Sequence, residues 1–163
     1  MSIAGPCALL PREPRILVLG YGNPGRQDDG LGPAVAAGIG SLGWPNLTAF
    51  DNYQLNIEDA VDVAGHDVVW FVDAAKTGPS PFAVHDVQPS PTIEFTSHIL
   101  RPEALLAIAR QCCGGSPRAF LLAIRGYEFE FVEALTPGAT ANLHAALAML
   151  TGRIRAMQMA APP

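Results

Sequence analysis

Hydrophobic residues in this chain gather in short runs, separated by stretches that contain glycine and proline. Unbroken apolar runs cover residues 16–19, 68–72 and 119–124, and a further short run covers 47–50. Runs of this length are typical of strands that are covered on both faces, as in the middle of a parallel sheet. Residues 82–87 alternate between apolar and polar positions, which predicts another strand.

The segments between these strands have apolar residues at the spacing of a helix. It predicts helices over residues 31–39, 56–64, 102–112 and 139–157. In the second helix we expect Glu58, Asp59 and Asp62 to face outward. Strands that alternate with helices predict a three-layer αβα sandwich with a mostly parallel central sheet. With 163 residues we expect a flexible leader over 1–14 and a single domain over 15–163.

The stretch after the first strand has an unusual composition. Gly20, Gly22 and Gly25 lead the chain out of the strand through turns that other residues would resist. The loop then carries two adjacent acids, Asp28 and Asp29, directly before the first helix. A phosphate-binding loop has no place for fixed negative charge. Either acid could cap the helix, or the pair could bind a cation or a proton.

A third acid, Asp73, stands where the buried strand 68–72 ends. The carboxyl ends of parallel strands share one edge of a sheet, which is where α/β proteins place their ligands. We therefore expect Asp73 on the same edge as Asp29. An unpaired carboxylate is costly at the end of a buried strand, so Asp73 is either hydrogen-bonded to a neighbouring loop or used in chemistry.

Among the four histidines, His98 differs because it lies in a loop ahead of the helix that starts at Pro102. We expect His66, His85 and His144 to be ordinary surface or core residues. One imidazole together with two or three carboxylates would suit a divalent first-row transition metal.

Composition excludes several classes of function. The net charge of −5 and a single lysine disfavour nucleic acid as a partner. No apolar run reaches the roughly 20 residues that cross a bilayer, and no basic region precedes the short apolar piece near the N-terminus. We expect no membrane partner and a cytoplasmic location. The adjacent Cys112 and Cys113 suit neither a disulfide nor a shared metal, and we take them and Cys7 as incidental.

Two further kinds of site are weakly supported. The chain has no G-x-S-x-G nucleophile elbow. Its GYGNPG stretch approaches a dinucleotide fingerprint, but the third glycine is misplaced and Asp28 and Asp29 would face the pyrophosphate.

Five blocks along the chain resemble one known family. GYGNPGRQDDGLGPAV is similar to the N-terminal signature of the hydrogenase maturation proteases, and VDAA and TSHILRP resemble its second and third blocks. DNYQLNIED and IRGYEFEFVEALTPGATANL resemble the branch that processes NAD-linked bidirectional hydrogenases. The resemblance implies a phosphorylase/hydrogenase-like fold. It also implies an endopeptidase that removes the C-terminal extension of the nickel-loaded large-subunit precursor of a [NiFe] hydrogenase.

The resemblance also implies which residues act. Asp29, Asp73 and His98 would read the nickel, with Asp28 and Asp51 in supporting roles. We hypothesise that Asp29 or Asp73 also serves in catalysis. The nickel would arrive in the precursor, which is the expected partner, so no tightly bound cofactor of the protease itself is expected.

Two alternatives stay open. Peptidyl-tRNA hydrolases also carry GNPG after an apolar strand, but a His-Asn pair stands where this chain has Asp28 and Asp29. A nickel-binding chaperone that escorts the large subunit without cutting it is the second. Loss of mass from the C-terminus of the precursor would separate the three.

Overall fold

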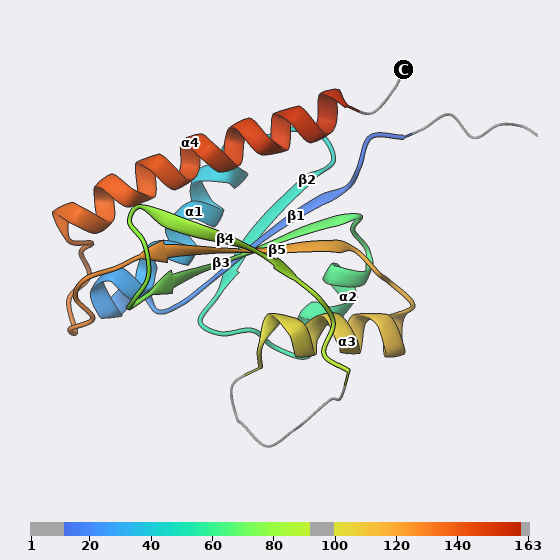
Figure 1. The fold of residues 1–163 in the computed structure, drawn as a ribbon, viewed down its shortest axis with the longest axis horizontal. Coiled ribbons are helices and arrows are strands. Elements are labelled where there is room, and N and C mark those ends of the chain that lie inside the picture. The colour runs from blue at the N-terminus through green and yellow to red at the C-terminus, as the bar shows by residue number, and fades with distance from the viewer. Residues whose placement is uncertain (1–11, 92–99, 161–163) are drawn as a thin grey trace, which may run out of the picture.

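The computed structural model describes residues 12–91 and 100–160, and its centre is a five-stranded sheet with the order β2-β1-β3-β5-β4 (Figure 1). Four of these strands are mutually parallel, and β4 runs antiparallel to β5 along one edge. The strands are β1 (Ile16–Tyr21), β2 (Leu47–Asn52), β3 (Val68–Ala75), β4 (Phe82–Val87) and β5 (Arg118–Arg125).

Helices cover both faces of the sheet, which confirms the three-layer αβα prediction (Figure 1). On one face α1 and α4 pack over a core that contains Trp70 stacked on Phe120, with ring centroids 4.6 Å apart. On the other face α2 and α3 cover Leu17, Leu19 and Phe71. The helices are α1 (Leu31–Gly40), α2 (Asp59–Ala64), α3 (Pro102–Cys113) and α4 (Pro137–Met159). None of the helices in the described part of the chain is both long and apolar enough to span a membrane.

The register of the three neighbouring parallel strands brings their carboxyl ends together. Gly20 of β1 pairs with Asp51 of β2 on one side and with Val72 of β3 on the other. From this edge the chain enters η1 (Pro24–Gly30), a pair of 3₁₀ turns that are joined by a kink at Arg26 and Gln27. The sheet therefore presents η1, Asp51 and the end of β3 at a common edge.

Two glycines allow α1 and η1 to lie directly on the end of β1. A Cβ on Gly20 would stand 2.1 Å from the carbonyl oxygen of Gly32 in α1, so the close approach of helix to strand requires glycine there. Gly22 has φ +141°, and a Cβ on it would stand 2.0 Å from the carbonyl oxygen of Asp29. Both glycines thus fix where Asp29 sits relative to the sheet.

We expect Gly22→Ala to destabilise the protein by about 3 kcal/mol, because it adds backbone strain and overlap together. The matched control is Gly43→Ala, since Gly43 also has a positive φ, +61°, but has open space around its missing Cβ. That variant should lose about 1 kcal/mol. Urea denaturation of both variants checks this, and equal losses would contradict the overlap with Asp29.

The region around α2 differs from the prediction. The helix covers only residues 59–64, and the expectation that Asp59 faces outward is wrong, because Asp59 is 7% exposed. Its carboxylate accepts hydrogen bonds from the Asn52 side chain at 2.9 and 3.1 Å and from the Asn56 backbone N–H at 2.8 Å. Ile57 and Val61, whose spacing predicted the buried face, are 51% and 67% exposed. Hydrogen bonding to the end of β2 outweighs the apolar pattern of this short helix.

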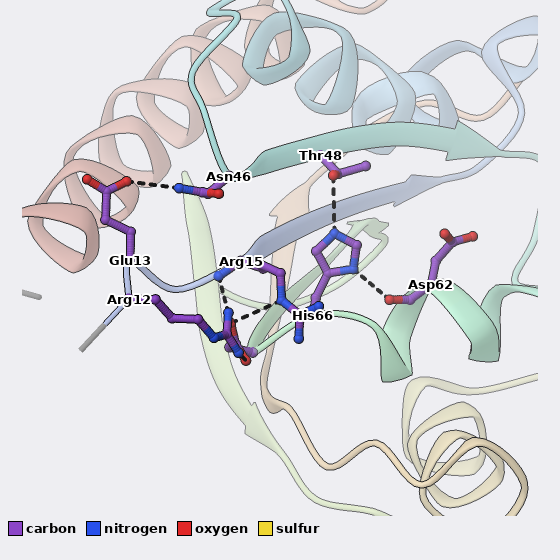
Figure 2. A network of polar contacts seen from close by, with 8 residues as sticks. Arg12, Glu13, Arg15, Asn46, Thr48, Asp62 and His66 are labelled. Atoms are coloured by element: carbon purple, nitrogen blue, oxygen red, sulfur yellow. Dashed lines mark hydrogen bonds and ion pairs between the residues drawn. The ribbon is translucent and has the colours of Figure 1, made fainter. Parts of the chain in front are cut away.

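A polar network closes the opposite edge of the sheet, where the parallel strands begin (Figure 2). Arg12 makes two hydrogen bonds to Asp67, at 2.9 and 2.8 Å, and the backbone N–H of Arg15 donates to the same carboxylate at 2.7 Å. Partial burial acts to raise the pKa of Asp67, but the hydrogen bonds from Arg12 and Arg15 outweigh it and hold that pKa at about 2. His66 donates from Nδ1 to the Asp62 carbonyl at 2.6 Å and accepts from the Thr48 hydroxyl at 3.1 Å.

Candidate active site

Asp29 and Asp73 form an acidic pair at the carboxyl edge of the sheet. Asp29 comes from the end of η1, and its carboxylate accepts the Asn23 backbone N–H at 2.8 Å, which holds the loop closed around it. Asp73 lies within β3, which continues three residues beyond the predicted end at residue 72, and its carboxylate accepts the Ala74 N–H at 2.8 Å. The structure therefore places the two predicted acids close enough for the charge of one to act on the other.

Burial raises the pKa of Asp73 to about 7, and the negative charge of Asp29 acts in the same direction. Hydrogen bonds from the Ala74 N–H and from the Tyr21 side chain oppose this shift without cancelling it. A carboxyl group with a pKa near neutrality can take up and release a proton at working pH. The pair of Asp29 and Asp73 is therefore suited to proton transfer or to binding a cation.

Tyr21 is a member of this site that the sequence did not single out. It is the last residue of β1. Burial raises the pKa of its hydroxyl, and the negative charge of Asp73 raises that pKa further. The hydroxyl therefore stays protonated and can donate to Asp73. The only signal in the sequence was its place at the end of the first strand, one residue before Gly22.

Asp28 has a separate structural role. Its side chain is fully buried, and it accepts the backbone N–H groups of Tyr127 at 2.7 Å, Glu128 at 3.1 Å and Thr136 at 2.8 Å, together with the Thr136 hydroxyl at 2.9 Å. Burial acts to raise the pKa of Asp28, but these hydrogen bonds outweigh it and lower that pKa. Asp28 does not cap α1, whose N-cap residue is Gly30 and has no side-chain hydrogen bond.

Asp51 lies exposed on β2 near the acidic pair's edge. It lines an open pocket of about 390 Å³ together with Pro24, Gln27 and Gly30 of η1. The remaining lining comes from α1 and from the chain before α4, namely Pro33, Ala34, Ala37, Glu133, Ala134 and Leu135. Asp51 thus borders the loop that carries Asp29, and no residue in the described part of the chain makes a hydrogen bond or ion pair with its carboxylate.

His98 lies outside the described residues, so the three-residue ligand set of Asp29, Asp73 and His98 stays a prediction. Within residues 12–91 and 100–160, no group of three or more His, Cys, Asp or Glu side chains is arranged to hold a metal ion. Cys112 and Cys113 are exposed free thiols. His66 belongs to the network on the opposite edge, while His85 and His144 are exposed.

The chain has an α/β fold that it shares with solved hydrogenase maturation proteases. No family model matches the chain, and no curated protein matches it. Among solved structures, it is similar to the hydrogenase maturating endopeptidase HybD from E. coli, with 23% identity, a TM-score of 0.68, and coverage of 87% of this chain and 93% of HybD.

Two archaeal structures are similar to the same extent. The [NiFe] hydrogenase maturation protease HycI from Thermococcus kodakarensis KOD1 has 20% identity, a TM-score of 0.69, and coverage of 86% and 92%. A hydrogenase 2 maturation peptidase from Thaumarchaeota archaeon SCGC_AB-539-E09 has 24% identity, a TM-score of 0.65, and coverage of 86% and 98%. At the level of the fold, these likenesses confirm the resemblance drawn from the sequence blocks.

Proposed function

We propose that this protein is an endopeptidase that removes the C-terminal extension from the nickel-loaded large-subunit precursor of a [NiFe] hydrogenase. The observation that carries this proposal is the meeting of Asp29 and Asp73 at the carboxyl edge of the sheet, in a fold shared with named hydrogenase maturation proteases. Neither a nucleophilic serine motif nor a buried thiol competes with these acids in the described chain.

In this proposal the nickel is part of the substrate. Carboxylate oxygens of Asp29 and Asp73, with the imidazole of His98 as the third predicted ligand, would bind the ion and thereby hold the neighbouring peptide bond at the sheet edge. The protease needs no metal of its own for this. Recognition of the ion would ensure that only a loaded precursor is cut.

Hydrolysis then requires a group that accepts a proton from water. We assign this role to Asp73, whose pKa is raised to about 7 by burial and by the charge of Asp29 in the protein without substrate. One oxygen of its carboxylate would bind the ion, and the other would accept the proton. The water oxygen forms a bond with the scissile carbonyl carbon as its proton passes to Asp73. When the carbon–nitrogen bond breaks, the same proton passes to the leaving amine, and Asp73 returns to its starting state.

The test uses purified full-length protein and a large-subunit precursor prepared with and without nickel. We expect mass spectrometry to show loss of the C-terminal extension from the loaded precursor, at a rate at least about 100-fold above that of the nickel-free form, since the ion supplies the orientation. Equal cutting of both forms would contradict recognition of nickel. Tight binding of the loaded precursor with no change in its mass would instead support a nickel-binding chaperone.

A further inference from the structure

The chain between β5 and α4 exposes apolar side chains beside the candidate site. We refer to residues 127–133 as the exposed segment. Phe131 is 86% exposed and Val132 is 48% exposed, although both sit in a part of the chain with well-defined contacts. The sequence pattern of alternating aromatic and acidic residues here does not correspond to a strand, because the segment has no ladder partner.

Buried and strained groups hold this segment in place. Asp28, fully buried, accepts the N–H groups of Tyr127 and Glu128 at the start of the segment and that of Thr136 just after it. Gln27 adopts φ +53°, which is unusual for a residue other than glycine, and its N–H donates to the Val132 carbonyl at 2.8 Å.

The Gln27 side chain adds two further contacts, and it anchors the middle of the segment. Its amide nitrogen donates to Glu128 at 2.8 Å, and its amide oxygen accepts the Glu130 N–H at 3.2 Å. Arg26 reaches the same region, donating to the Phe129 carbonyl at 3.3 Å and lying 5.4 Å from the centre of the Phe131 ring.

Holding the exposed segment in this conformation costs free energy in the isolated protein. Ordering a residue costs about 1–2 kcal/mol, and a strained backbone costs about as much again. Burial of Phe131 offsets little of either cost, because this ring is 86% exposed, and Val132 is only about half-buried. A surface segment that is already ordered binds a partner more tightly, because less conformational entropy is lost when the complex forms.

The charge around the exposed segment indicates the chemistry of the partner. Glu128, Glu130 and Glu133 are all exposed, and Glu133 lines the adjoining pocket together with Asp51. Three basic residues stack on rings of this segment, namely Arg26 on Phe131, Lys76 on Phe129 and Arg125 on Tyr127. The charged residues that line the pocket itself, Asp51 and Glu133, are both acidic. This pocket of about 390 Å³ is also lined by the apolar residues Pro33, Ala34, Ala37 and Leu135, which could contact an aliphatic side chain.

We propose that the exposed segment and the adjoining pocket dock a basic and apolar stretch of the precursor's polypeptide, separate from the metal-reading acids. This inference rests on the proposed function for the identity of the partner. Phe131 and Val132 supply the apolar contact, and Glu133 and Asp51 pair with lysine or arginine of the precursor. Because η1 carries both Asp28, which holds the segment, and Asp29, docking there would bring the precursor to the acidic pair.

Two variants and two matched controls test the docking surface. Phe131→Ala removes the exposed ring, and Glu133→Lys reverses a charge on the pocket. Met159→Ala changes an apolar residue that is 78% exposed at the far end of α4, and Asp86→Lys makes the same charge change on β4, opposite Phe120 near the start of β5. Neither control residue contacts the exposed segment in the structure.

We expect each test variant to raise KM for the loaded precursor about tenfold and to change kcat by less than about twofold, since docking contacts do not touch the reacting bond. The controls should leave both constants unchanged. Cleavage by Phe131→Ala and Glu133→Lys with wild-type KM would overturn the docking surface and leave the proposed function intact.

A second measurement is independent of cleavage. A fluorescein-labelled synthetic peptide of alternating lysine and leucine should bind the wild-type protein and bind both test variants about tenfold more weakly, whereas the same peptide with glutamate in place of lysine should not bind. Equal binding of the basic peptide to wild type and variants, or no binding at all, would overturn the proposal. Selective binding without any cleavage of precursor would instead count against the proposed function alone.

Discussion

Asp73→Asn is expected to lower kcat/KM for the nickel-loaded precursor by at least about 1,000-fold and, at pH 8, to stabilise the folded protein. The loss of activity follows because an amide cannot accept a proton from water and binds a metal ion poorly. The gain in stability follows because a buried carboxylate next to Asp29 is replaced by a neutral group of the same shape.

The sign of the stability effect depends on pH. The pKa of Asp73 rises from 3.8 to about 7 on folding, mainly through burial, so the folded state holds this proton more tightly than the unfolded chain. The contribution of the protonated Asp73 carboxyl to the free energy of unfolding is fully present below pH 3.8 and is lost as the pH rises toward 7. At pH 8 the variant should exceed the wild type by up to about 4 kcal/mol, and the difference should close near pH 4.

Urea denaturation of the wild type and Asp73→Asn at several pH values between 4 and 8 measures this difference directly. The matched control is Asp86→Asn, because Asp86 is exposed on β4 away from the site. That variant should retain cleavage and show no pH-dependent gain. Cleavage by Asp73→Asn within tenfold of the wild type would rule out Asp73 as the base, and a stability difference that is constant with pH would contradict its burial.

Asp28→Ala should have the largest structural effect of any single change near the site. It leaves three backbone N–H groups and the Thr136 hydroxyl without their acceptor, in a position that is fully buried. Each hydrogen bond to a charged group contributes about 1.5–3 kcal/mol, and water entering the gap recovers part of this. We expect a loss of about 4 kcal/mol, with the start of α4 and the exposed segment loosened first.

Hydrogen exchange and urea denaturation measure the consequence of Asp28→Ala. Amides of residues 127 and 128 and of Thr136 should lose protection before those of β5 do. The free energy of unfolding of Asp28→Asn should lie between those of the wild type and Asp28→Ala. The asparagine amide keeps one oxygen that accepts hydrogen bonds, but its NH₂ group faces backbone N–H donors that it cannot bind. A loss under about 1 kcal/mol with unchanged exchange would contradict the role of Asp28 in holding this segment.

Acid should weaken the same contacts. Hydrogen bonds to Asp28 hold its pKa below the ordinary value despite burial, so the stability it provides is present above the ordinary pKa of an aspartate. That stability is lost as the pH falls through the lowered pKa of the folded state. In Asp28→Ala this acid-dependent part should be absent.

The sequence predicted the layers of the fold and the edge where Asp29 and Asp73 meet. Both follow from local rules, since an unbroken apolar run predicts a buried strand and the ends of parallel strands share an edge. The role of Asp28 follows from no local rule, because its donors lie 99 to 108 residues further along the chain. Its neighbour Asp29 has the same chemistry in the sequence, and only the tertiary structure distinguishes the two.

Asp59 was mispredicted for a related reason. A helix of six residues has too few apolar positions to fix which face turns inward, so a pair of hydrogen bonds from Asn52 decides its orientation. Tyr21 was missed because nothing in a strand's pattern states what its last side chain will face across the sheet. For both residues the deciding contact joins two elements of the fold, whereas a hydrophobic pattern describes one element at a time.

The described chain begins at Arg12 and ends at Ala160 on the same side of the molecule, where the parallel strands start (Figure 1). Asp29 and Asp73 lie at the opposite side, and α4, whose 23 residues extend for about 33 Å, runs from one side to the other. A fluorescent label attached to an exposed side chain on that side, such as Met159 replaced by cysteine, would therefore stand clear of the acidic edge. Immobilising the molecule through such a position would leave that edge facing outward toward an incoming protein.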